Sequence, residues 1–215
     1  MALNKQEIEL VMNAIDAIEE RKEHQYAAPT YRDVSLLKQL EAILALHQDE
    51  NEVETIKDCI VLARYLADAY EKMWRIIYAQ KYYQILMKLH FNYYQCTKTY
   101  AECGNDYYLA LRCMNYYGKD SCDELREMAK VLLPLEKRSK IEKQILEDFH
   151  PLKHDPIECS EAYLAVIDDV EAELAQKGIP RRHFYEVNAM KQKILKKYGI
   201  KWKTMMELNP KVHFD

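Results

Sequence analysis

The chain of 215 residues carries a formal net charge of -4 at pH 7, and 49 % of its residues are hydrophobic. This length and apolar content suffice to bury a core, so a chain disordered throughout is excluded. The small acidic excess gives no general attraction to nucleic acid or to an anionic membrane. No apolar run approaches the roughly 18 residues of a membrane-spanning helix, and the N-terminus meets charge at once, so we expect a soluble cytoplasmic protein without membrane association.

Helix-forming residues dominate the composition. Only four Gly and six Pro are present, and residues 30–103 contain neither, while apolar side chains recur there every three or four positions. Runs of β-branched residues are scarce. The sequence therefore predicts an all-α fold of about nine helices, arranged as stacked antiparallel hairpins or an irregular helical bundle.

The first two helices are each expected to begin at a capping box. Asn4 with Glu7 three residues later opens the first, and Thr30 with Asp33 opens the second. An apolar stripe follows in each helix: Ile8, Val11, Ile15 and Ile18 in the first, and Val34, Leu37, Leu40, Ile43, Leu44 and Leu46 in the second.

The next helix is expected to begin near Val53 and to bury Leu66, Ala67 and Tyr70. Residues 60–90 resemble a degenerate tetratricopeptide repeat, a helix-turn-helix unit of about 34 residues with small and aromatic residues at fixed places. The first helix of that unit is matched by the three residues above, and the second by Ala79 and Tyr83. The resemblance implies a close helical hairpin and a scaffold that binds protein or peptide.

Two features depart from the repeat. Trp74 and Arg75 stand where the family has small turn residues, so the turn is displaced or the helix continues through them. The Pro that commonly closes the unit is absent near Phe91. A weaker echo of the pattern follows 43 residues later, at Leu109, Ala110, Cys113, Gly118 and Cys122, and closes at Pro134.

Further helices are expected to end at Gly118, to run from Ser121 to Leu133, and to run from Pro134 to Phe149. The segment HPLKHDP, residues 150–156, then carries two prolines in seven residues. We expect a boundary there, between a helical body of residues 1–150 and a C-terminal hairpin with a docked tail, residues 151–215. The alternative is that both belong to one continuous domain.

The two arms of the C-terminal hairpin carry opposite charge. Seven acidic residues and no Lys or Arg lie between Asp155 and Glu173, whereas nine basic residues and one acidic residue lie between Lys177 and Lys203. We expect two antiparallel helices that neutralise each other, joined by a turn at Gly178 and Pro180. The tail is expected to dock through these residues: Trp202, Met205, Leu208, Val212 and Phe214. Its ending, GI-x-W and NP-x-x-x-FD, resembles the ends of some small uncharacterised bacterial proteins, which indicates a bacterial source and implies no activity.

One cluster of residues could serve metal chemistry. It contains His150, His154, Asp155, Glu158 and Cys159. Pro151 and Pro156 disfavour the helix that would bring the two His side chains together, so we interpret the cluster as a polar linker and expect neither a metal nor a cofactor. An α-helical metal-dependent hydrolase that uses residues 150–159 remains the enzymatic alternative.

Other catalytic signatures are missing from the sequence. It has no G-x-S-x-G elbow, no Gly-rich phosphate loop and no C-x-x-C pair. Because a secretory signal is also missing, the cysteines are expected to be reduced and buried. They are Cys59, Cys96, Cys103, Cys113, Cys122 and Cys159.

Tyrosine is concentrated in one part of the chain. Twelve of the 17 lie between Tyr65 and Tyr117, several in adjacent pairs, and neighbouring helical residues point about 100° apart. We therefore expect one ring of each pair in the core and the other at its edge. The rings at the edge could line a groove for a partner, with these residues as candidates: Trp74, Arg75, Tyr78, Tyr82 and Tyr93.

Nucleic acid is a further alternative, through the basic helix of residues 180–203 with its interleaved aromatic residues. The neighbouring acidic arm would cancel much of its field, so nucleic acid is a disfavoured partner. The sequence favours a non-catalytic helical scaffold that binds protein or peptide, and it does not define the oligomeric state.

Overall fold

The computed structural model describes residues 3–25, 31–100, 102–116, 123–148, 152–178 and 183–213. Over these ranges the chain forms ten α-helices and two short 3-10 helices, with no β-strand. The all-α prediction is confirmed. The chain divides into two compact units, Met1–His150 (unit 1) and Pro151–Asp215 (unit 2).

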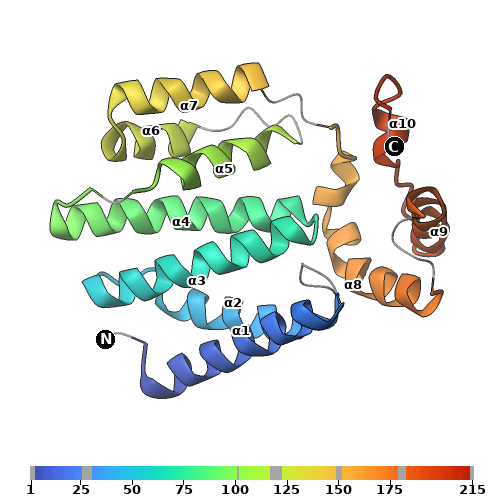
Figure 1. Cartoon of the computed structure of the whole chain (residues 1–215), viewed down its shortest axis with the longest axis horizontal. Helices are drawn as coiled ribbons and strands as arrows, with labels where there is room; N and C mark the ends of the chain where they lie inside the picture. The colour runs from blue at the N-terminus through green and yellow to red at the C-terminus, as the bar shows by residue number, and fades with distance from the viewer. Residues whose placement is uncertain are drawn as a thin grey trace. The chain divides into compact units, whose positions relative to one another are not determined.

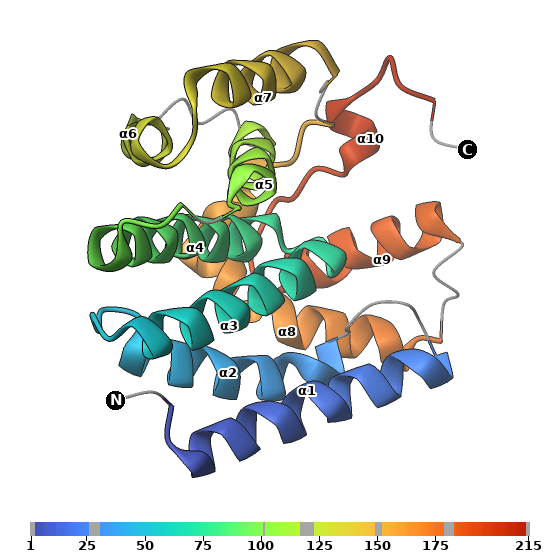
Figure 2. The ribbon, with the colours of Figure 1, turned by 60° about the vertical axis from the view of Figure 1, so that its left-hand side comes forward.

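Unit 1 is a stack of helices that alternate in direction along the chain (Figure 1). Its α-helices are α1 (Lys5–Gln25), α2 (Val34–His47), α3 (Val53–Lys72), α4 (Ile76–Thr97), α5 (Gly104–Asn115), α6 (Asp123–Leu132) and α7 (Leu135–Asp148). Helix α4 lies at the centre and packs against α3, α5 and α6. Figure 2 shows α3 and α4 side by side again, with α1 and α2 beyond α3.

The capping box expected at the start of α1 is present. The Asn4 Oδ1 atom accepts hydrogen bonds from the backbone N–H groups of Gln6 and Glu7, and Glu7 Oε2 accepts one from the N–H of Asn4 at 2.9 Å. Ile18 is fully buried, but Ile8 is 45 % exposed, so its placement on the inward face was wrong. The reason is that α1 is an edge helix that packs mainly against α2.

Helix α2 begins differently from the prediction. Thr30 lies outside the described residues, and Asp33 closes a 3-10 turn, Tyr31–Asp33, without capping α2 through its side chain. Instead, the buried Asp33 carboxylate pairs with Arg21 of α1, with 2.8 Å between Oδ1 and Nη1. Leu46 is 71 % exposed, contrary to the expected stripe. It lies two positions after the buried Leu44, and residues two apart on a helix point in nearly opposite directions.

The hairpin of α3 and α4 forms the centre of the core. Leu66, Ala67 and Tyr70 on α3 are buried, as expected. Ala79 and Tyr83 on α4 are also buried, and the small side chains let the two backbones approach closely. The chain turns at Met73–Arg75, so the helix does not continue through the position where the family has its turn.

The remaining helices of unit 1 follow the expected order. The expected cap residues Gly118 and Ser121 lie outside the described residues. Helix α6 begins at Asp123, and α7 begins directly after Pro134. The buried Tyr107 of α5 donates a hydrogen bond of 2.7 Å from its hydroxyl to Glu142 Oε1, which ties α5 to α7.

Unit 2 contains a short 3-10 helix, Pro156–Cys159, and three α-helices, α8 (Glu161–Gln176), α9 (Phe184–Lys197) and α10 (Met205–Leu208). Helices α8 and α9 pack together, and Lys197 Nζ lies 2.5 Å from Glu173 Oε1 between them. The core of the unit consists of Tyr163, Ile167, Val170, Ile194, Leu195, Ile200 and Trp202.

The tail after α9 docks on unit 2, as expected. Trp202 is buried, and the Asn209 side chain exchanges two hydrogen bonds with the backbone of Lys153, at 2.9 and 3.0 Å. Val212 is exposed and takes no part, contrary to the prediction. Pro180 and Phe214 lie outside the described residues.

Candidate functional site

The aromatic residues singled out in the sequence do not form one open groove. Trp74 is 60 % exposed at the turn between α3 and α4. The rings of Tyr78 and Tyr82 both stack on the Tyr70 ring, at centroid distances of 5.0 and 5.8 Å. The hydroxyl of Tyr70 in turn donates a hydrogen bond of 2.5 Å to Glu41 Oε1 on α2. The stack therefore belongs to the packing between helices.

Three of the five candidates do not lie where a surface groove would require them. Tyr82 is only 2 % exposed, and Arg75 is also buried, so neither can line a surface groove. Tyr83 is buried as well, so the expected division of each tyrosine pair fails here because neighbouring helices cover both directions. Tyr93 lies 15 positions after Tyr78 on the same helix, about 22 Å away along its axis, and is not brought to Trp74.

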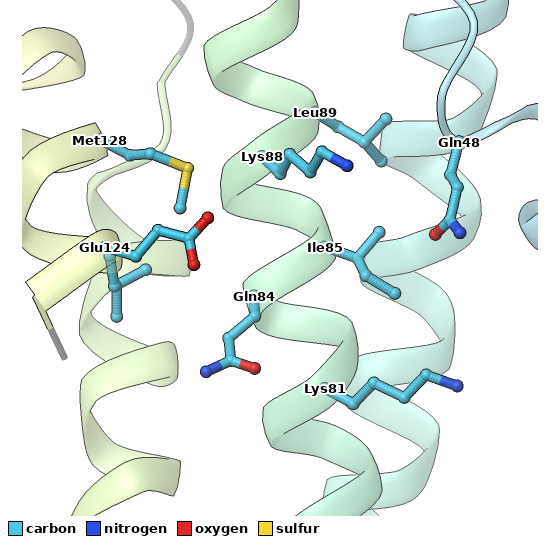
Figure 3. A pocket seen from close by; sticks show the side chains of 9 residues that line it. Gln48, Lys81, Gln84, Ile85, Lys88, Leu89, Glu124 and Met128 are labelled. Carbon is cyan, nitrogen blue, oxygen red and sulfur yellow. The ribbon is translucent and has the colours of Figure 1, made fainter. Parts of the chain in front are cut away.

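A groove does cross α4, at a place that the sequence did not indicate (Figure 3). Its volume is about 380 Å³, and it spans from the end of α2 across α4 to α6. We call it the α4 groove. It is lined by Gln48, Lys81, Gln84, Ile85, Lys88, Leu89, Glu124, Leu125 and Met128.

The floor of the α4 groove is apolar. Leu89 and Leu125 are buried and belong to the core of unit 1, and Ile85 and Met128 are half-buried against it. Ile85 and Leu89 lie four residues apart and therefore share one face of α4. Apolar side chains of α4 and α6 thus meet solvent at the bottom of the groove.

The walls of the α4 groove differ in charge. Lys81 and Lys88 lie two turns apart on α4, about 10 Å along the axis. Lys88 Nζ pairs with Asp49 Oδ1 at 2.8 Å, and Lys81 Nζ lies 5.0 Å from the centre of the Tyr82 ring. Glu124 of α6 faces α4 from the opposite wall (Figure 3). One wall is therefore basic and the other acidic.

Sequence reasoning missed the α4 groove because it depends on where α6 packs. That placement is a long-range contact, which helical periodicity does not encode. One local signal was available: Lys81 and Lys88 share a face with Ile85, so charge flanks an apolar residue there.

The residues suggested for metal chemistry hold the tail of unit 2. His154 Nδ1 lies 3.2 Å from Glu158 Oε2, and Trp202 Nε1 donates a hydrogen bond of 2.7 Å to Glu158 Oε1. Burial opposes ionisation of Glu158, but the hydrogen bond with His154 and the charge of Lys191 outweigh it and hold its pKa below the usual value. Asp155 accepts hydrogen bonds from the backbone N–H groups of Ile157 and Lys203.

His150 lies outside the described residues. In the parts of the chain that the structure describes, no group of three or more His, Cys, Asp or Glu side chains could hold a metal ion. The polar side chains of this segment fasten the tail instead.

A second polar cluster joins α3, α4 and α5. The buried Asp106 carboxylate accepts a hydrogen bond of 2.7 Å from Arg64 Nη2 and lies 2.9 Å from His90 Nε2. Burial raises the pKa of Asp106, but the hydrogen bonds from His90 and Arg64 outweigh this effect and lower it. Asp106 is therefore a carboxylate that ties three helices together.

The cysteines are mostly buried thiols. Burial raises the pKa of Cys59 and Cys103 to about 11 and that of Cys113 to about 12, which makes their thiolates scarce at neutral pH. Cys96 is exposed, contrary to expectation, and its Sγ atom lies 3.5 Å from the Asn51 carbonyl before α3. Cys159 is half-buried. Cys122 lies outside the described residues.

The fold and the groove define an all-α protein with a solvent-facing cleft on its central helix. Comparisons with models of protein families, with curated proteins and with solved structures find no match to this chain. Within the described ranges, no helix combines the length and apolar character needed to cross a bilayer.

Proposed function

We propose that this chain is a non-catalytic scaffold that binds a peptide segment of a partner protein in the α4 groove. The observation that carries the proposal is a groove in which the half-buried Ile85 and Met128 lie beside two lysines of α4 and a glutamate of α6. The partner segment is amphipathic. Its apolar side chains cover Ile85 and Met128, and its carboxylates face Lys81 and Lys88.

The floor supplies the binding energy in this proposal. Covering a partly exposed side chain such as Ile85 contributes about 25 cal/mol for each Å² of apolar surface removed from water. Met128 adds an unbranched, polarisable side chain that adapts to differently shaped partners. The groove volume of about 380 Å³ lies at the small end of ligand sites, which suits a few side chains of a peptide.

The charged side chains beside the groove determine the direction in which a peptide binds. The ion pair of Lys88 with Asp49 is exposed, and exposed pairs contribute only about 0 to 1 kcal/mol. A partner carboxylate can therefore replace Asp49 at little cost. Glu124 repels a carboxylate from the opposite wall, so a peptide with separated charges binds in one direction only.

A peptide selection tests the proposal. Phage-displayed random peptides are selected on the full chain, and the affinity of each isolate is measured for a groove variant, Ile85→Gln with Met128→Gln. The matched control makes the same two chemical changes on α1, Ile8→Gln with Met12→Gln, where both side chains are exposed. We expect isolates to lose at least about tenfold in affinity for the groove variant and to bind the control like the wild type. Equal binding to both variants would overturn the proposal.

A second arm tests the walls. Lys81→Glu with Lys88→Glu should weaken acidic isolates, and the loss should shrink as salt is added. Lys72→Glu with Lys140→Glu makes the same charge change at exposed positions outside the groove. If acidic peptides are not selected, or if both pairs of substitutions weaken binding equally, the assigned partner chemistry is wrong.

A further inference from the structure

The basic residues of unit 2 divide into two groups. Some are used by the fold itself. Lys197 pairs with Glu173 between α9 and α8. Lys191 Nζ lies 4.6 Å from the centre of the Trp202 ring and 5.5 Å from that of Tyr163, close to the half-buried Glu158. These two side chains are committed to packing.

The other group shares one exposed face of α9. Lys193 and Lys196 lie within about 80° of Tyr185 around the helix, over about 16 Å of its length. Both lysines are exposed, Tyr185 is 64 % exposed, and no ion pair of either lysine occurs among the described residues. The single acidic residue of α9, Glu186, lies in its first turn and pairs with His183 at 3.4 Å.

The turn after α9 brings a third exposed lysine close to the end of this helix. Gly199 adopts a φ of +75°, and the N–H of Ile200 bonds back to the carbonyl of Leu195. The chain then runs back along α9, because the Trp202 carbonyl accepts a hydrogen bond of 3.1 Å from Gln192 Nε2. The exposed Lys201 therefore lies beside the end of α9. We call Tyr185, Lys193, Lys196 and Lys201 the basic strip.

We propose that the basic strip binds single-stranded nucleic acid, with the lysines on successive phosphates and a base stacked on Tyr185. An exposed ring beside a row of cations is the combination that such ligands require, because every base offers a face for stacking. Insertion into a membrane surface is disfavoured, since the apolar side of α9, Ile194 and Leu195, is buried in the core of unit 2.

The number of lysines in the basic strip determines how strongly binding is expected to depend on salt. Three phosphate contacts on a single strand give a slope of about -2 for the logarithm of the binding constant against the logarithm of the salt concentration. Binding is therefore detectable at low salt, and the binding constant falls by about a hundredfold between about 20 and 200 mM NaCl.

Fluorescence anisotropy with a labelled oligothymidine of about 20 nucleotides tests this on the full chain. The strip variant is Lys193→Gln, Lys196→Gln and Lys201→Gln. The control, Lys72→Gln, Lys140→Gln and Lys211→Gln, removes the same charge from other exposed positions. We expect the strip variant to lose at least about tenfold at low salt and to flatten the salt slope, whereas the control keeps the slope of the wild type.

The tyrosine is tested separately. Tyr185→Phe keeps the ring and should keep the affinity, whereas Tyr185→Leu should lose at least about fivefold. Circular dichroism confirms that each variant remains folded. The proposal is overturned if the wild type does not bind at low salt, if the control loses as much as the strip variant, or if Tyr185→Leu binds like Tyr185→Phe. It is also overturned if anionic phospholipid vesicles, rather than the oligonucleotide, are bound through the same lysines.

Discussion

Trp74 and Gly199 hold the same place in two helix-ending turns with the same hydrogen bonds. In each turn the residue's own N–H bonds to the carbonyl three positions earlier, and the next N–H bonds to the carbonyl five positions before it. The φ angle is +60° at Trp74 and +75° at Gly199. Glycine adopts this left-handed conformation freely, whereas a residue with a Cβ atom pays about 1 to 2 kcal/mol. The α3–α4 turn therefore stores backbone strain under an exposed ring.

This strain can be measured with two substitutions. Trp74→Ala removes the indole but keeps a Cβ atom, whereas Trp74→Gly removes both. We expect Trp74→Gly to have a free energy of unfolding about 1 kcal/mol higher than Trp74→Ala, measured by urea denaturation. The same exchange at an ordinary helical position, Ala189→Gly on the exposed face of α9, should instead destabilise by about 1 kcal/mol. Equal stability of the two Trp74 variants would show that the turn relaxes without strain.

The sequence predicted much of the helical framework, because helix content and apolar spacing are local properties. Ala67, Tyr70, Ala79 and Tyr83 were assigned to the contact between two helices from apolar spacing together with the resemblance to a helix-turn-helix repeat, and all are buried. The candidate site was not predictable in the same way. Whether Tyr82 faces solvent depends on which helices surround α4, and the α4 groove exists only where α6 packs beside it. The spacing of residues along one helix encodes neither the neighbours of α4 nor the position of α6.

Tyr82 should behave as a core residue. Tyr82→Ala removes a ring that is buried and stacked on Tyr70, so we expect a loss of about 3 to 5 kcal/mol in the free energy of unfolding. Tyr78→Ala should cost less, because Tyr78 is only half-buried. Tyr185→Ala, at an exposed position, should change stability by less than about 0.5 kcal/mol. Urea denaturation of the three variants gives the order, and a Tyr82 variant as stable as the Tyr185 variant would contradict the described packing.

His47 should make stability depend on pH. Its Nε2 and Nδ1 atoms lie 3.0 Å from Glu7 Oε1 and 2.8 Å from Glu50 Oε1, and carboxylates only accept hydrogen bonds, so the imidazolium fits best. The hydrogen bond with Glu7 raises the pKa of His47 above its ordinary value of 6.5, against the effect of burial, and lowers that of Glu7 below 4.5. Because the pKa of His47 is higher in the folded state, protonation of His47 stabilises the fold below pH 6.5. This contribution is lost as the pH rises through the pKa of the folded state. The contribution of Glu7 is lost as pH falls through its own lowered pKa.

The difference in stability between the wild type and His47→Gln should therefore be largest between about pH 4.5 and 6.5. We expect a difference of about 1 kcal/mol there, which declines at higher pH. Thermal denaturation across this range measures it. His213→Gln, at an exposed position, serves as the control and should follow the wild type at every pH. A difference that grows with rising pH would have the wrong sign and would exclude the proposed pairing.

Asp106 should contribute more to stability than any exposed acidic residue. Asp106→Asn removes the charge that compensates Arg64 and leaves His90 without its carboxylate. Loss of one partner from a fully buried pair costs about 3 to 5 kcal/mol, but Arg64 is 40 % exposed and can be hydrated, so we expect about 2 to 3 kcal/mol at neutral pH. Because the folded pKa of Asp106 is lowered, its contribution to stability is present above pH 3.8 and disappears as the pH falls through the folded pKa.

The control is Asp49→Asn, which breaks the exposed pair with Lys88 and should cost less than about 1 kcal/mol. Urea denaturation at neutral and acidic pH distinguishes the two, and equal losses would mean that the buried cluster holds the three helices no more firmly than a surface ion pair.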